Sequence, residues 1–116
     1  MTRTHRNMSS RSKVGGFPTL AVMANWLITR QLTKVGARLA SLRAELTVID
    51  EQAMYLDDDA ADAELRAIVS ESDRDGYHAR SEGGHAAAMQ RHRAKVVEEI
   101  GRLERRQDDL LDRMAR

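Results

Sequence analysis

The chain has 116 residues, of which 32% are charged and only 3% aromatic, and it contains no cysteine. This length is enough for one small domain, and the lack of cysteine excludes disulfides, thiolate metal sites and a cysteine nucleophile. The scarcity of aromatic residues argues against a β-sandwich or a β-barrel. Nineteen basic and 18 acidic residues give a formal net charge of +1, which argues against binding to nucleic acid or membranes through bulk charge.

Residues 1–18 are predicted to form a disordered, basic N-terminal leader. The basic residues in this segment are Arg3, Arg6, Arg11 and Lys13. A basic start followed by the apolar stretch 14–28 has the layout of a signal peptide, but the helical pattern begins inside that stretch and continues without a break. We therefore expect a cytoplasmic protein, in which the four basic side chains of the leader are candidate phosphate contacts.

A first long helix is predicted for residues 19–72, because apolar residues recur there at steps of three and four. These positions are Leu32, Val35, Leu39, Leu42, Leu46, Ile49, Ala53, Leu56, Ala60, Ala63 and Ala67. A strict seven-residue repeat of this kind indicates the seam of a left-handed coiled coil, meaning the line of residues that faces a second helix.

A turn is predicted at residues 73–84, and a second helix over residues 85–116. Serine, aspartate and glycine gather at 70–76, and Gly83-Gly84 follows, which is a composition typical of loops. The second seam comprises Ala86, Met89, Arg93, Val96, Ile100, Leu103, Gln107, Leu110 and Met114. Two seams joined by a short connection favour an antiparallel hairpin. The expected fold class is therefore all-α: a single helical-hairpin domain over residues 19–116.

The distribution of charge favours the same antiparallel orientation. Residues 50–64 contain seven acids and no base, whereas residues 80–95 are net basic. Residues 30–43 contain four bases and no acid, and residues 98–113 are net acidic. An antiparallel hairpin places each acidic segment beside a basic one. Exposed ion pairs are individually weak, so they select the orientation more than they stabilise it.

The two predicted helices differ in length, which leaves a segment without an intramolecular partner. Pairing residue for residue places helix 85–116 beside residues 41–72, so residues 19–40 would extend beyond it. The residues predicted to bind a partner there are Trp26, Leu27, Ile28, Leu32, Val35 and Leu39. A monomer seldom exposes such a patch to water, so we expect a homodimer or another helical protein to cover it. A membrane surface is the third alternative.

No pattern in the sequence is typical of an enzyme, a metal site or a cofactor site. His78, His85 and His92 recur at intervals of seven, which separates successive members by about 10.5 Å on a helix and is too far for one metal ion. Glycine-rich phosphate loops and nucleophile motifs are not found. We expect no catalytic residue, no metal, no cofactor and no small-molecule substrate.

The predicted function is a non-enzymatic coiled-coil interaction module, such as an adaptor, a small regulator or a subunit of an assembly. The alternative is a transcriptional regulator that associates with nucleic acid through the basic leader.

Overall fold

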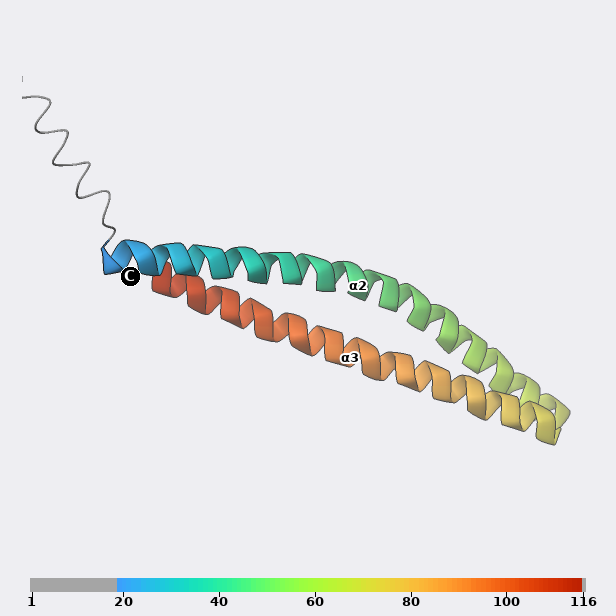
Figure 1. Ribbon diagram of the computed structural model, residues 1–116. Helices are drawn as coiled ribbons and strands as arrows, with labels where there is room; N and C mark the ends of the chain where they lie inside the picture. Colours follow the sequence, from blue (N-terminus) through green and yellow to red (C-terminus); the bar gives the residue numbers. More distant parts are fainter. Residues whose placement is uncertain (1–18, 116) are drawn as a thin grey trace, which may run out of the picture.

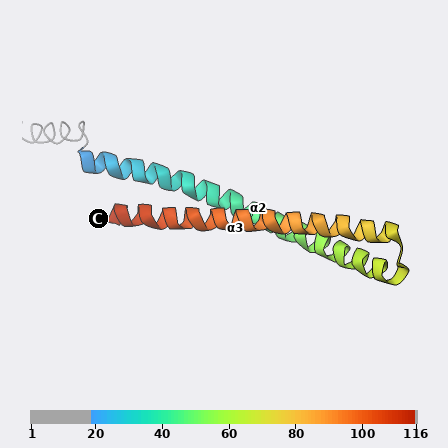
Figure 2. The ribbon, with the colours of Figure 1, turned by 90° about the horizontal axis from the view of Figure 1, so that it is seen from below.

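Two long antiparallel helices form the part of the chain that the computed structural model describes, residues 19–115. Helix α2 spans Leu20–Ser70 and helix α3 spans Asp73–Ala115. The helices lie side by side, with the start of α2 and the end of α3 at one end of the molecule and the turn at the other (Figure 1). Seen from below, α2 passes behind α3, and the two helices cross near the middle of the hairpin (Figure 2). The expected all-α hairpin is confirmed, whereas the leader, residues 1–18, lies outside the described residues.

The connection between the helices is much shorter than predicted. Only Glu71 and Ser72 separate α2 from α3, so the turn expected at 73–84 is wrong. Glu71 adopts the left-handed backbone conformation, with φ 55° and ψ 26°, and its N–H donates a hydrogen bond to the Ala67 carbonyl at 3.0 Å. A left-handed residue of this kind is a common way to end a helix, although glycine usually occupies the position.

The serine- and aspartate-rich segment starts a helix and does not form a loop. The Ser72 hydroxyl accepts a hydrogen bond from the Asp75 N–H at 3.2 Å, and the Ser70 hydroxyl donates one to the Asp75 carboxylate at 2.6 Å. Ser72 therefore caps α3. Asp73 and Asp75 lie in the first turn of α3, where negative charge interacts favourably with the helix dipole.

The glycines that were read as loop residues lie inside α3. None of the described glycines has a positive φ, so Gly83 and Gly84 are ordinary helical residues. The second seam also extends toward the N-terminus of α3. Steps of three and four lead from Ala86 to Gly83 and Ala79, and both residues are half-buried. The seam therefore runs through the segment whose composition resembles a loop.

The predicted coiled-coil seam is confirmed on both helices. Every seam position from Leu32 to Ala67 on α2, and from Ala86 to Leu110 on α3, is buried or half-buried. The central cluster comprises Leu39, Leu42, Ile49, Val96 and Ile100, with Val35, Leu46, Met89 and Leu103 packed against it. Met114, at the end of the second seam, is 39% exposed.

Side-chain pairs between the helices agree with the predicted antiparallel orientation. Arg38 lies 3.1 Å from the Glu99 carboxylate, and Arg43 lies 2.9 Å from that of Glu104. The remaining polar contacts across the seam include Arg93 with Asp50, Gln90 with Asp57, His92 with Glu45, and Arg106 with Gln31. The side chains of all these pairs are at least partly exposed to solvent, so each pair contributes little to stability while the set opposes a parallel arrangement.

Residues 19–40 were predicted to lack an intramolecular partner, but the second half of this segment packs along α3, whereas residues 19–27 are exposed. Because the connection lies at 71–72 and not at 73–84, each residue of α3 lies beside a residue of α2 that is nearer to the start of α2 than predicted. As a result Arg106 donates a hydrogen bond to the Gln31 side chain at 3.1 Å, and Val35 packs against the central cluster. The prediction that all of residues 19–40 extend beyond α3 is therefore wrong.

Candidate interaction surface

Five large apolar residues at the start of α2 are exposed, and we call them the terminal cluster. They are Leu20, Val22, Met23, Trp26 and Leu27. Trp26 is the only tryptophan of the chain and is 58% exposed. The guanidinium carbon of Arg30 lies 5.5 Å from the centre of the Trp26 ring, a separation typical of a cation–π contact.

A side-chain cap holds the terminal cluster in a helix. The Thr19 hydroxyl accepts a hydrogen bond from the Val22 N–H at 3.2 Å, and the Thr19 carbonyl accepts one from the Met23 N–H at 3.0 Å. Threonine is a preferred residue at this position because its side chain satisfies an N–H that has no partner within the helix. Helical geometry then spaces Met23, Trp26 and Leu27 along one side of α2.

The six residues predicted to bind a partner do not share one surface. Trp26 and Leu27 are exposed, whereas Ile28 and Leu32 are half-buried, and Val35 is part of the packing described above. Leu39 is only 1% exposed, so it serves the contact between α2 and α3 and is not available to a partner. That Trp26 and Leu27 bind a partner stays a prediction.

The side of α2 opposite α3 carries a second apolar stripe, which we call the outer face. Its large apolar members, each between 49 and 86% exposed, are Leu20, Met23, Trp26, Leu27, Val48, Met54, Tyr55, Leu65, Ile68 and Val69. Smaller exposed residues lie between them: Thr33, Ala37, Ala40, Ser41, Ala44, Thr47 and Ala61. The charged residues of the outer face are Arg30, Lys34, Glu51, Asp58 and Asp62.

Large apolar residues gather at both ends of the outer face. The terminal cluster lies at one end, and Leu65, Ile68 and Val69, which we call the turn-end cluster, lie in the last two turns of α2, next to the connection at 71–72. The sequence prediction considered only the seam and did not include the turn-end cluster. The signal was the recurrence of apolar and small residues at steps of three and four on the opposite side of the same helix.

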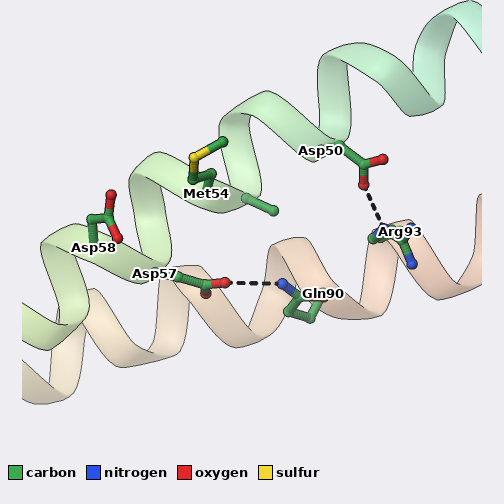
Figure 3. A pocket seen from close by; sticks show the side chains of 7 residues that line it. Asp50, Met54, Asp57, Asp58, Gln90 and Arg93 are labelled. Carbon is green, nitrogen blue, oxygen red and sulfur yellow. Dashed lines mark hydrogen bonds and ion pairs between the residues drawn. The ribbon is translucent and has the colours of Figure 1, made fainter.

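The polar contacts to α3 come from the flanks of α2 and not from the outer face. Figure 3 shows Asp50 and Asp57 pointing toward Arg93 and Gln90 of α3, while Met54 and Asp58 point away from it. Within residues 19–115, no ion pair between the helices involves an outer-face residue. The outer face is therefore uncovered in the single chain.

The corresponding side of α3 is charged. Its exposed residues include Arg74, Arg80, Arg91, Lys95, Glu98, Arg102, Arg105, Asp108, Asp109 and Asp112. A solvated helix normally has polar residues opposite its core face, and α3 follows this pattern. Because α2 does not, its outer face is the candidate interaction surface.

Other kinds of site have little support in the described part of the chain. Residues 19–115 contain no group of three side chains placed to hold a metal ion. A groove between the helices is lined by Asp50, Ala53, Met54, Asp57, Asp58, Gln90 and Arg93. Four of these side chains form two pairs, Arg93 with Asp50 and Gln90 with Asp57. No helix within this range combines the length and apolarity needed to cross a bilayer.

Comparison of the chain with protein-family models, with curated proteins and with solved structures gives no match.

Proposed function

We propose that this protein is a non-enzymatic, cytoplasmic coiled-coil interaction module that binds a partner through the apolar start of α2. The observation that carries the proposal is the terminal cluster, in which Trp26 is 58% exposed and Leu20 is 86% exposed. Burying apolar surface contributes about 25 cal/mol per Å². Tryptophan is also among the residues that most often dominate binding energy at protein interfaces.

The hairpin supports this role by holding the cluster on a rigid helix. Leu39 and Leu42 anchor the first half of α2 against α3, and the Thr19 cap secures its first turn. A binding residue on an ordered helix loses less conformational entropy on association than one on a flexible segment. An adaptor, a small regulator and an assembly subunit would each use such a surface.

The test is the double substitution Trp26→Ala with Leu27→Ala. Both side chains are about half exposed, so we expect helix content and the melting temperature by circular dichroism to stay close to those of the native chain. Association should weaken by at least about tenfold, equivalent to about 1.4 kcal/mol. It is measured by sedimentation of the full chain over a concentration range and by recovery of partner proteins on immobilised chain.

Tyr77→Ala is the matched control, because it removes an aromatic side chain that is 70% exposed on α3. It should leave association unchanged. If Trp26→Ala with Leu27→Ala melts the hairpin, or associates like the native chain, the proposed function is wrong.

A further inference from the structure

We propose that the partner of the outer face is a second copy of this chain, packed antiparallel along the length of α2. This inference rests on the proposed function, because it names the partner of the same apolar surface. It also extends that surface from the terminal cluster to the turn-end cluster. In the resulting four-helix assembly the two α2 helices lie in the middle, and the charged sides of both α3 helices stay in water.

The first argument is the polarised charge of α2. Residues 20–43 contain four bases and no acid, and residues 44–65 contain eight acids and no base. The outer face repeats this division, with Arg30 and Lys34 in the first half and Asp58 and Asp62 in the second. These four side chains form no ion pair among residues 19–115. They are therefore free to pair with another molecule.

In an antiparallel contact between two copies, each of these charges lies beside an opposite charge of the other copy, and the two-fold symmetry gives two equivalent sets of pairs. A two-fold axis through the middle of α2 brings the basic half of each copy beside the acidic half of the other, and the symmetry repeats the contact. A parallel contact would bring the two basic halves together and the two acidic halves together, which is unfavourable. The charges of the outer face are thus self-complementary in one orientation only.

The second argument is the distribution of side-chain size. With the axis between Ala44 and Thr47, helical spacing places Trp26 opposite Leu65 of the second copy, and Met23 opposite Ile68. The terminal cluster of each chain then meets the turn-end cluster of the other. Near the axis, Ala37, Ala40 and Ala44 are small enough to let the helices approach closely, and Ala37 faces the larger Met54.

The extent of the outer face fits a stable dimer. At 1.5 Å per residue, α2 is about 75 Å long. The outer face offers about 20 residues on each copy, which is the number typical of specific interfaces that bury about 1,600 Å² in total. Arg30 can remain stacked on Trp26 while its guanidinium reaches the acidic half of the second copy.

Single-cysteine variants test the orientation directly, because the native chain has no cysteine. Ala37→Cys and Met54→Cys change two exposed positions. Under mild oxidation, an equal mixture of the two variants should give a disulfide between position 37 of one chain and position 54 of the other. Each variant alone should stay uncrosslinked. Crosslinking of each variant to itself, without the mixed product, would establish a parallel dimer and overturn the proposal. Ala88→Cys, exposed on α3, is the control that should not crosslink.

Charge reversal tests the pairing without oxidation. Lys34→Glu and Asp58→Lys should each weaken dimerisation by about tenfold in sedimentation equilibrium, and the two changes in one chain should restore it. Arg91→Glu reverses an exposed charge on α3 and should have no effect. Failure of the doubly substituted chain to recover would overturn the antiparallel pairing.

The two proposals fail in different ways. If the native chain is monomeric at about 100 μM, where a dimer of micromolar affinity would be largely formed, the second copy is not the partner. The proposed function would still be judged by whether Trp26→Ala with Leu27→Ala abolishes recovery of a different partner protein. If the chain dimerises but that double variant dimerises equally well, the terminal cluster is not the binding surface and both proposals are wrong.

Discussion

At the scale of single residues, Glu71 determines where the chain reverses direction. Its φ of 55° places it in the left-handed region, which is unfavourable by about 1–2 kcal/mol for a residue with a Cβ atom. Glycine adopts this conformation without that steric penalty. We therefore expect Glu71→Gly to raise the free energy of unfolding by about 1 kcal/mol, as measured by urea denaturation.

Glu64→Gly is the comparison for this prediction, since Glu64 is exposed within α2. Glycine inside a helix should lower stability by about 1 kcal/mol, so the two substitutions have opposite signs. Equal destabilisation by both would mean that the chain does not turn at Glu71.

Two adjacent leucines test the packing of the hairpin at the same scale. Leu110 is fully buried and Leu111 is 49% exposed. Leu110→Ala removes a buried side chain and leaves a cavity, so it should lower the free energy of unfolding by about 2–5 kcal/mol. Leu111→Ala should lower it by less than about 1 kcal/mol. Chemical denaturation of the two variants measures the difference, and equal losses would contradict the burial of Leu110 in the seam.

At the scale of the elements, the continuity of α3 through its paired glycines can be tested by substitution. A Cβ atom added at Gly83 or at Gly84 would meet no atom within 4 Å, so alanine fits at both positions. Each change to alanine should raise the free energy of unfolding by about 1 kcal/mol, because alanine favours the helix and restricts the unfolded chain. The measurement is thermal and urea unfolding followed by circular dichroism. A loss of stability would indicate that this segment is not helical in solution.

The seam was predicted correctly from the sequence, whereas the position of the helix boundary was predicted wrongly. Hydrophobic periodicity reports burial directly, so the positions from Leu32 to Ala67 followed from their spacing. The boundary depends on a capping geometry that several residue types satisfy. A pair of glycines usually indicates a turn, yet Gly83-Gly84 is helical here. The capping pattern of Ser72 with Asp75 was the signal that could have placed the turn correctly.

At the scale of the whole molecule, one misplaced turn changes which residues are available to a partner. The predicted turn at 73–84 left Leu39 without a neighbour, whereas the observed turn buries it against α3. Trp26 and Leu27 are exposed under either pairing because they lie on the side of α2 opposite α3. The turn-end cluster lies on the side of α2 opposite the predicted seam, so its spacing could have been recognised in the sequence. The position of the turn, by contrast, determined which part of residues 19–40 is left uncovered by α3.

The single tryptophan gives a test of the dimer that depends on both ends of the molecule. Trp26 and Leu65 lie 39 residues apart on α2, or about 58 Å at 1.5 Å per residue, so neither can affect the other within one chain. In the antiparallel dimer they are neighbours. We expect Trp26 emission to shift to shorter wavelength as protein concentration rises, because the second copy removes the indole from water. Leu65→Gln, at a position that is 61% exposed, should reduce this shift while leaving the dilute chain unchanged. Tyr77→Gln on α3 should preserve the shift, and an identical shift for Leu65→Gln and the native chain would exclude the antiparallel contact.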